Sequence, residues 1–288
     1  MRIVVVGGRG NLGVGYCNYL STQDQVLVWD REEDLFNLDD KTLIKFKPDF
    51  LINFSVIPNF RDFGVDPESD YFRLHILGVG QIINNCKRLR IPLIHLSTRE
   101  VVGIRDWSAQ EYDTRPCHRG VLLVDESVQY FPLHAYGKTK LMSEFLIQSY
   151  ELGTIIRLNT PYTDDIASRK GLIANLVMKS FHDKFITLDN SGGALRDPLH
   201  ISDIVEMSKL IIEQKSFQQI FHAGGGPLNC LSLKEICQLA NPDVAVLDGI
   251  INQDKGFLMD NSKAQRILGW APRIAFRSWL SSVLATVH

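Results

Sequence analysis

The sequence lacks the features that mark nucleic-acid-binding and membrane proteins. Its 31 Lys and Arg residues are matched by 33 Asp and Glu residues, which gives a formal net charge of -2 and a pI near 6.4. Without a basic excess or a Lys/Arg run, the chain has no patch suited to a phosphate backbone or an anionic lipid surface. The apolar stretch at Ile3–Val6 is too short for a signal peptide or a membrane span. We therefore expect neither nucleic acid nor a membrane as a partner.

Disulfide and metal-binding patterns are also missing. The five cysteines are scattered, odd in number and never spaced as C-x-x-C, so free thiols in a reducing compartment, the cytoplasm, explain them better than disulfides. The histidines form no H-x-x-x-H pair and no Cys/His cluster with metal-ligand spacing, so no metal is expected. The cysteines are Cys17, Cys86, Cys117, Cys230 and Cys237.

Short apolar runs alternate with longer helical patterns through the first half of the chain. This alternation is typical of βαβ units, and it predicts an α/β fold with a Rossmann-type, doubly wound parallel sheet. Apolar residues at helical spacing predict helices over residues 72–89 and from Tyr136 to about Tyr150. The predicted strands are Ile3–Val6, Val26–Trp29, Phe50–Phe54, Leu93–Leu96 and Thr154–Arg157.

A glycine-rich turn follows the first predicted strand. Gly7, Gly10 and Gly13 have the spacing G-x-x-G-x-x-G and open a predicted helix. Glycines there permit a tight turn and a close approach of the backbone to a pyrophosphate, while the helix N-terminus supplies N–H donors and the positive end of its dipole. The turn predicts a dinucleotide site, with a purely structural glycine turn as the alternative.

The second predicted strand ends at an acidic residue. Asp30 is placed to accept hydrogen bonds from the adenosine ribose hydroxyls, which favours NAD over NADP. Arg31 follows directly and could neutralise a 2′-phosphate, so the sequence leaves NADP open. Asp34 and Leu35 are candidates to face the adenine, with a solvated turn as the plain alternative.

Two portions of the chain differ in regularity. After Arg157 the alternating pattern is interrupted by Pro161 and by glycine-rich turns. We expect residues 1–158 to form the NAD-binding Rossmann domain and residues 159–288 to form a smaller, mainly substrate-binding α/β portion. Segments within about 198–225 are expected to return to the Rossmann sheet.

A tyrosine and a lysine lie one helical turn apart in the second predicted helix. Tyr136 and Lys140 have the i, i+4 spacing that places both side chains on one face. An adjacent ammonium group and a positive nicotinamide would favour the phenolate form of the tyrosine. Such a group can take a proton from a hydroxyl while a hydride leaves the same carbon. A surface helix that carries a lysine is the plain alternative.

A hydroxyl pair, Ser97 and Thr98, lies at the end of the fourth predicted strand, where ligand crevices of α/β sheets open. Thr98 is placed to donate a hydrogen bond to a substrate oxygen near Tyr136. The alternative is that both hydroxyls only cap the turn.

With these residues together, the chain resembles the extended short-chain dehydrogenase/reductases, the NAD-dependent epimerase/dehydratase family that acts on nucleotide sugars. The likeness runs nearly end to end. It rests on the glycine turn and on Asn53-Phe54-Ser55, Asp66-Pro67-Glu68, Ser97-Thr98, Tyr136-Gly137-Lys138-Thr139-Lys140-Leu141 with Glu144, Arg196-Asp197 with Asp203, Ala223-Gly224-Gly225-Gly226, and Leu268-Gly269-Trp270.

The resemblance implies a nucleotide-sugar substrate, NAD as the cofactor, and roles for individual residues. Arg196 would approach the nucleotide phosphates, with an ion pair to Asp197 as the alternative. Family members are commonly dimers through a helix pair that would include the Tyr136 helix, which makes a homodimer a candidate and leaves the oligomeric state open. The implied catalytic residues are Thr98, Tyr136, Lys140 and Glu100; the implied NAD-binding residues are Gly7, Gly10, Asn11, Leu12, Gly13, Asp30, Arg31, Asp34, Leu35, Phe54, Ser55, Tyr136 and Lys140; the implied substrate-binding residues are Thr98, Arg99, Asn175 and Arg196.

Three departures from the family pattern concern the substrate side. The family's dehydratases carry Thr-Asp-Glu after the fourth strand, and here Arg99 replaces the middle acid while Glu100 remains. Because elimination of water needs both an acid and a base, the loss of one carboxylate weakens the dehydratase interpretation. The helix asparagine of the family appears as His75, and the asparagine of Asn-x-Tyr-Gly-Pro appears as Thr160.

Three hypotheses of function follow. The first is an epimerase or related isomerase that oxidises a sugar hydroxyl transiently, with NAD unchanged overall. The second is a reductase of a nucleotide-linked keto sugar that consumes NADH or NADPH. The third is a dinucleotide-binding sensor without catalytic activity, which the unusual Arg99, His75 and Thr160 suggest and the retained Tyr136, Lys140 and Thr98 disfavour.

Overall fold

The computed structural model describes residues 1–30, 40–56, 69–103, 122–251 and 256–285. The chain divides into two compact units. The first unit consists of Met1–Gly103, Gln129–Arg157 and Val205–Phe221, and the second consists of Ile104–Val128, Leu158–Ile204 and His222–His288.

A six-stranded sheet with the strand order β11-β6-β4-β3-β1-β2 forms the centre of the first unit. β1 pairs in parallel with both β2 and β3, and β3 pairs in parallel with β4. The Rossmann-type α/β class predicted from the sequence is confirmed, and the five predicted strands are present with ends shifted by one or two residues. The strands are β1 (Arg2–Val6), β2 (Gln25–Trp29), β3 (Phe50–Asn53), β4 (Leu93–Thr98), β6 (Gly153–Leu158) and β11 (Ile220–Ala223).

Strand order reverses between β1 and β3, because the chain goes first to β2 on one side of β1 and then to β3 on the other. The central strands are apolar on both faces, and Val4, Leu51 and Leu93 are completely buried in one core cluster. Such continuous apolar runs are what a sheet covered on both faces requires. In sheets of this kind, ligands bind beyond the carboxyl ends of the strands at the reversal point.

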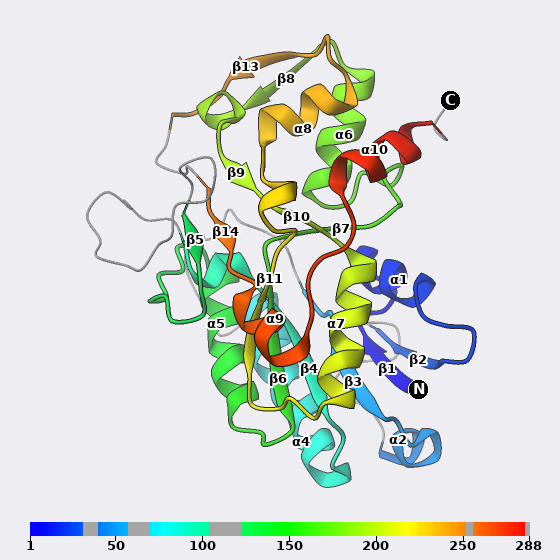
Figure 1. Ribbon diagram of the computed structural model, residues 1–288. Coiled ribbons are helices and arrows are strands. Elements are labelled where there is room, and N and C mark those ends of the chain that lie inside the picture. The colour runs from blue at the N-terminus through cyan, green and yellow to red at the C-terminus, as the bar shows by residue number, and fades with distance from the viewer. Residues whose placement is uncertain (31–39, 57–68, 104–121, 252–255, 286–288) are drawn as a thin grey trace. The chain divides into compact units, whose positions relative to one another are not determined.

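Helices lie on both sides of this sheet. Figure 1 shows α4 and α5 on one side and α1 and α7 on the other. The predicted helix over residues 72–89 is present, but a π-helical turn at Arg73–Gly78 interrupts it. The helices are α1 (Asn11–Asn18), α2 (Asp40–Phe46), α3 (Asp70–Phe72), α4 (Val79–Leu89), α5 (Ala135–Gln148) and α7 (Ile201–Glu213).

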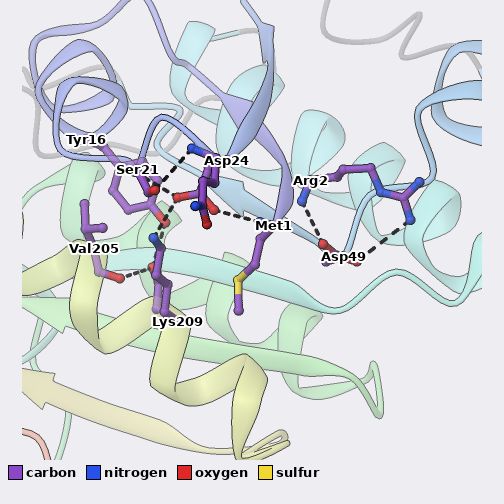
Figure 2. Close-up of polar contacts among 10 residues, drawn as sticks. Met1, Arg2, Tyr16, Ser21, Asp24, Asp49, Val205 and Lys209 are labelled. Carbon is purple, nitrogen blue, oxygen red and sulfur yellow. Dashed lines mark hydrogen bonds and ion pairs between the residues drawn. The ribbon is translucent and has the colours of Figure 1, made fainter.

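Polar contacts fasten α7 to the N-terminal part of the first unit (Figure 2). The carboxylate of Asp24 accepts hydrogen bonds from the Met1 amino group and from Lys209 Nζ, both at 2.7 Å. Burial tends to raise the pKa of Asp24, but these two cations hold it below the ordinary value. The hydroxyls of Tyr16 and Ser208 are hydrogen-bonded at 2.6 Å. These contacts join helix α7 to the segment that contains β1 and α1.

In its described residues, the second unit contains short strand pairs and four α-helices. Its core is formed mainly by α6, α8 and α10, with Val177, Ile236 and Phe276 completely buried. No helix in the described part of the chain is long and apolar enough to cross a membrane. The elements are β5 (Leu123–Val124), β7 (Thr160–Tyr162), β8 (Phe185–Leu188), β9 (Leu195–Arg196), β10 (Pro198–His200), β12 (Leu231–Ser232), β13 (Ala245–Asp248), β14 (Leu258–Met259), α6 (Leu172–His182), α8 (Leu233–Ala240), α9 (Ser262–Leu268) and α10 (Phe276–Leu284).

Candidate active site

The glycine turn between β1 and α1 is tightly packed against neighbouring backbone. Gly7 has a φ of +73°, and a Cβ atom there would lie 3.0 Å from the backbone of Phe54 and Ser55. A Cβ atom at Gly13 would lie 2.3 Å from the Gly7 carbonyl oxygen. Gly10 directly precedes α1, and its carbonyl accepts the Val14 amide at 2.9 Å. Two glycines are therefore required by space, and the turn ends at a helix N-terminus next to Asn11 and Leu12, which begin α1.

Asp30 follows β2 and lies across this turn. Its Oδ2 atom accepts a hydrogen bond from the backbone N–H of Arg9 at 2.8 Å. The acidic residue expected to bind a ribose is thus fixed beside the residues expected to bind a pyrophosphate. Arg31, Asp34 and Leu35 lie outside the described residues.

The segment after β3 supports the turn from the other side of the reversal point. Phe54 donates its backbone N–H to the Val6 carbonyl at 2.8 Å, and its ring packs on Tyr16 with centroids 5.0 Å apart. Ser55 donates both its N–H and its hydroxyl to Asn53 Oδ1, at 2.9 and 2.6 Å. Both Phe54 and Ser55 are buried, and they hold a fixed position beside Gly7.

Tyr136, Thr98 and Lys140 come together beyond the carboxyl end of β4. The Tyr136 hydroxyl is hydrogen-bonded to the Thr98 side chain. Lys140 lies one turn further along α5 and is almost completely buried, and its Nζ donates to the carbonyls of Leu96 at 2.9 Å and Ser55 at 3.2 Å. The three side chains that the sequence analysis grouped together therefore lie near the carboxyl end of β4 in the first unit.

Burial dominates the titration of both groups. It raises the pKa of Tyr136 above the ordinary value, against the opposing effect of the Thr98 hydrogen bond, and the Glu100 carboxylate raises it further. Burial also lowers the pKa of Lys140 to about 7, against the opposing charge of Glu144. The expectation that Lys140 makes the phenol acidic is not met in this structure, because its ammonium group is directed to two carbonyls.

Arg99 and Glu100 follow Thr98 in a 3-10 turn that extends to Val101. Thr98 Oγ1 accepts the Glu100 N–H at 3.2 Å, so it caps this turn while it also bonds Tyr136. Arg99 Nε lies 3.7 Å from Glu100 Oε1. The Arg99 side chain is buried, and Glu100 is about a quarter exposed. A Cβ at Gly137 would lie 2.5 Å from the Glu100 carbonyl oxygen, so the start of α5 needs a glycine to approach this turn.

Ser97 and Thr98, adjacent in sequence, have different partners. Ser97 donates to Glu144 Oε1 at 2.5 Å, and Arg157 donates to Glu144 Oε2 at 2.6 Å. Arg157 and Glu144 are completely buried, and the guanidinium stacks 4.5 Å from the centre of the Tyr130 ring. Glu144 carries part of the family likeness, but nothing in the local spacing could have shown that it pairs with Arg157.

His75 contacts the same helix from the π-helical turn. Its Nδ1 is 2.8 Å from Thr139 Oγ1, and its ring meets that of Tyr136 edge-on with centroids 5.9 Å apart. Burial and the charge of Lys140 lower the pKa of His75 far below its ordinary value, so the imidazole is neutral. The residue that replaces the family's asparagine is therefore packed against the candidate tyrosine.

Two expected substrate-binding residues lie in the second unit. Asn175 is in the first turn of α6, and its N–H donates to the Gly171 carbonyl at 3.1 Å. Arg196 is in β9, and its Nη1 donates to the Leu195 carbonyl at 2.8 Å. No group of His, Cys, Asp and Glu in the described ranges has the arrangement of a metal site.

Comparison with known proteins identifies the family. Residues 3–224 match the NAD dependent epimerase/dehydratase family, and the chain belongs to it. This confirms the family resemblance and the NAD dependence expected of the family. The chain is 22% identical to dTDP-glucose 4,6-dehydratase of Haemophilus influenzae, with 97% of this chain and 96% of that protein covered. It is 25% identical to dTDP-4-dehydro-6-deoxyglucose reductase of Escherichia coli over 54% of this chain and 53% of that protein.

Solved structures share the fold over the full chain. UDP-glucuronic acid 4-epimerase from Bacillus cereus, in complex with UDP-glucuronic acid and NAD, is similar with a TM-score of 0.78, 21% identity and complete coverage of both chains. A dTDP-4-dehydrorhamnose reductase from Clostridium acetobutylicum is similar with a TM-score of 0.76 and 19% identity, covering 100% of this chain and 99% of that one. At these identities the likeness establishes the fold.

Proposed function

We propose that this protein is an NAD-dependent enzyme that oxidises a hydroxyl group of a nucleotide-linked sugar transiently and then reduces it again, as an epimerase or related isomerase. The observation that carries the proposal is the hydrogen bond between Tyr136 and Thr98 with Lys140 one turn away on α5. The names of the relatives, which are dehydratases, epimerases and reductases of dTDP- and UDP-sugars, support the substrate class.

The residues around the first turn fit a dinucleotide. The close backbone packing at Gly7 and Gly13 leaves no space for side chains, the α1 N-terminus follows Gly10, and Asp30 is fixed across the turn. Bound NAD would supply the hydride acceptor and a positive ring. Gly7, Gly10, Asn11, Leu12 and Gly13 would hold its pyrophosphate, Asp30 its ribose, and Phe54 and Ser55 its nicotinamide side, with Arg31, Asp34 and Leu35 proposed near the adenosine.

Each side chain at the carboxyl end of β4 then has one task. Thr98 donates a hydrogen bond to the sugar oxygen and keeps it near Tyr136. Tyr136 takes the proton of that hydroxyl as the C–H bond of the same carbon breaks, and it returns the proton when the carbon is reduced again. The positive ring of bound NAD would favour the phenolate form, Lys140 borders the cofactor, and Glu100 is the second acid of the site.

An epimerase or isomerase is favoured over a dehydratase by the buried guanidinium of Arg99. Elimination of water needs a proton donor at the leaving hydroxyl, and here a guanidinium, which does not release its proton, occupies the position of the family's middle acid. Arg99 is suited instead to bind an oxygen of the sugar, while Arg196 binds the nucleotide phosphates and Asn175 contributes to the substrate side.

A reductase of a nucleotide-linked keto sugar is the second candidate. The matches to two reductases, one of them over the full length of both chains, favour it. The two functions differ in the fate of the cofactor, because a reductase consumes NADH or NADPH and an epimerase leaves NAD unchanged. A panel of UDP- and dTDP-sugars followed by NMR, with nicotinamide absorbance recorded in parallel, separates them.

The test of the catalytic assignment is Tyr136→Phe. Removing the hydroxyl should lower kcat by roughly 10²–10⁴-fold, the usual contribution of general acid–base catalysis. NAD affinity should stay within a few-fold, because the phenol acts on the sugar. Asp30→Ala is the matched change on the cofactor side, and it should weaken NAD by about 1–3 kcal/mol. Full activity of Tyr136→Phe would exclude the proposed chemistry.

We also propose a cytoplasmic homodimer. The described cysteines are all free thiols, which suits a reducing compartment. Leu77 in the π-helical turn and Met142 and Phe145 on α5 are about half exposed, and these two segments pack against each other. An apolar face of this kind fits a symmetric contact with a second copy. Phe145→Glu should produce a monomer in size-exclusion chromatography with light scattering, and an unchanged mass would contradict this interface.

A further inference from the structure

Five buried residues form a closed ring of hydrogen bonds beneath the candidate site. Ser55 Oγ donates to Asn53 Oδ1 at 2.6 Å, and Asn53 Nδ2 is 3.1 Å from His95 Nδ1. His95 Nε2 is 3.1 Å from Ser143 Oγ, which donates to the Lys140 carbonyl at 2.7 Å. Lys140 Nζ donates back to the Ser55 carbonyl at 3.2 Å. The ring joins the segment after β3, strand β4 and helix α5.

The direction of every bond in this ring is fixed by chemistry. Ser143 has one hydroxyl proton, and the Lys140 carbonyl can only accept it, so His95 Nε2 must be the donor to Ser143. Asn53 Oδ1 already accepts two bonds from Ser55, so the amide NH₂ of Asn53 faces His95 and donates to Nδ1. Only the neutral Nε2–H tautomer of His95 satisfies both neighbours.

Burial supports the same protonation state. Asn53, His95 and Ser143 are completely buried. Burial lowers the pKa of His95 well below its ordinary value, and the neighbouring Lys140 and His75 side chains lower it further. A second proton on the imidazole would turn Nδ1 into a donor that faces the donating amide of Asn53. Protonation of His95 is therefore disfavoured by the hydrogen-bond network as well as by burial.

We propose that His95, as the Nε2–H tautomer, is a positioning residue for Lys140. Through Ser143 and Asn53 it fixes the lysine relative to Ser55, which packs against the glycine turn. Lys140 is held at two points of the ring, its carbonyl by Ser143 and its ammonium by Ser55. Ser55 in turn packs against Gly7, 3.0 Å from where a Cβ would stand. The assignment rests on the proposed function of Lys140, but the position of its ammonium group can be measured without catalysis.

The sharpest variant is Asn53→Asp. A carboxylate keeps both bonds from Ser55 but cannot donate to His95 Nδ1, so it draws a proton onto Nδ1. His95 Nε2 then either takes the Ser143 proton away from the Lys140 carbonyl or becomes part of a charged imidazolium. Ser143→Ala removes the same link without adding a charge, and His95→Leu removes both links. His95→Gln places an amide NH₂ near the Nε2 position and should restore the bond to Ser143.

A matched control lies two residues along the same strand. Ser97, like His95, bonds a polar side chain of α5 from β4, but its partner is Glu144 outside the ring. Ser97→Ala therefore removes a buried β4–α5 hydrogen bond of the same kind and leaves the ring intact.

The first readout is the titration of Lys140 in the protein without substrate, followed by NMR of labelled lysine side chains. The titratable groups to account for around this ammonium are Glu144, His75 and His95. Loosening the Ser55 carbonyl from the ammonium removes an acceptor for its charged form, so Ser143→Ala and His95→Leu should lower the Lys140 midpoint by about one pH unit. Asn53→Asp also adds a carboxylate that favours the ammonium form, so its readouts are the His95 tautomer and kcat. Ser97→Ala should leave it in place, and the nitrogen correlation pattern of His95 should show the Nε2–H tautomer in the unchanged protein.

The second readout is kinetic. The three ring-breaking variants should lower kcat roughly 10–100-fold with KM within a few-fold, since a misplaced group loses rate without losing ground-state binding. His95→Gln should recover most of that loss. If the ring variants match Ser97→Ala in both the Lys140 midpoint and kcat, the ring is only structural and the proposal is wrong. If the midpoint shifts as expected while Tyr136→Phe remains active, the positioning stands and the proposed chemistry fails.

Discussion

Helix α5 buries polar side chains on two sides, one against β4 and the other against the π-helical turn at Arg73–Gly78. Against β4, His95 belongs to the closed ring of hydrogen bonds, and Glu144 accepts hydrogen bonds from both Ser97 and Arg157. Against the π-helical turn, His75 bonds Thr139 through Nδ1, and nothing among the described residues bonds its Nε2. The same helix thus has one fully paired polar support and one that is partly paired.

The two supports use opposite histidine tautomers for the same reason. Thr139 donates to the Ala135 carbonyl at 2.8 Å, and Ser143 donates to the Lys140 carbonyl. Each hydroxyl therefore accepts from its histidine, so His75 carries its proton on Nδ1 and His95 on Nε2. Fully paired buried networks define one geometry, whereas an unpaired buried acceptor weakens the fold and leaves that side adaptable. The fully paired side is the one that contains Lys140.

The largest effect should come from breaking the ion pair on the β4 side. Arg157→Met leaves the Glu144 carboxylate buried, with Ser97 as its one remaining donor in the described part of the chain, and should lower the free energy of unfolding by about 3–5 kcal/mol. Thr139→Val on the other side removes only neutral hydrogen bonds and should lower it by about 1–3 kcal/mol. Urea denaturation of both variants measures the difference, and equal losses would remove the distinction between the two sides.

The next largest effect concerns Lys140, which lies between the two supports. Burial lowers its pKa in the folded protein to about 7, while the unfolded value is about 10.4. Between these values the unfolded chain binds a proton that the native protein does not, so stability is fully present above the unfolded pKa and is lost as pH falls to the folded one. Unfolding free energy should therefore rise by ~2–4 kcal/mol from neutral to alkaline pH. Lys140→Met should abolish this rise, and a rise that persists would show that other groups cause it.

Local spacing was enough to predict part of the fold and of the site. The strands, the glycine turn and the i, i+4 pair Tyr136 and Lys140 depend on residues close together in the chain, and each is found on the element expected for it. The doubly wound parallel sheet followed from the alternation of apolar runs, whereas its strand order became known only from the structure. The period of apolar residues and the spacing of glycines are enough to predict these features.

Local spacing could not predict the buried polar contacts on the two sides of α5. His75 and Thr139 are 64 residues apart, and His95 and Ser143 are 48 apart, so only tertiary packing pairs them. Ser97 and Thr98 looked like one hydroxyl pair, but Ser97 bonds Glu144 and only Thr98 bonds Tyr136. The expected acidification of the phenol failed because spacing shows that Lys140 is near but not that two carbonyls take its ammonium group.

A smaller effect comes from both histidines at low pH. Both have a folded pKa far below the unfolded value of about 6.5, so each contributes stability that is present above that value and lost as pH falls toward the folded pKa. Each should add up to about 1.4 kcal/mol per pH unit to the slope of the acid limb. His95→Leu and His75→Leu should each flatten that limb in denaturation series below pH ~6.5. A limb left unchanged by both would mean that neither imidazole stays neutral.

The smallest effect is expected at an exposed ion pair, where a charge can be removed without any change in burial. Arg90 Nη1 lies 3.4 Å from Glu151 Oε1 beyond the end of α5, with side chains 73% and 59% exposed. Water screens such a pair, so Glu151→Gln should change the free energy of unfolding by only ~0–1 kcal/mol, less still at high salt. The Arg157–Glu144 pair has the same charges but is completely buried. A loss at Glu151 as large as that of Arg157→Met would mean that charge itself, and not its burial, distinguishes the two sides of α5.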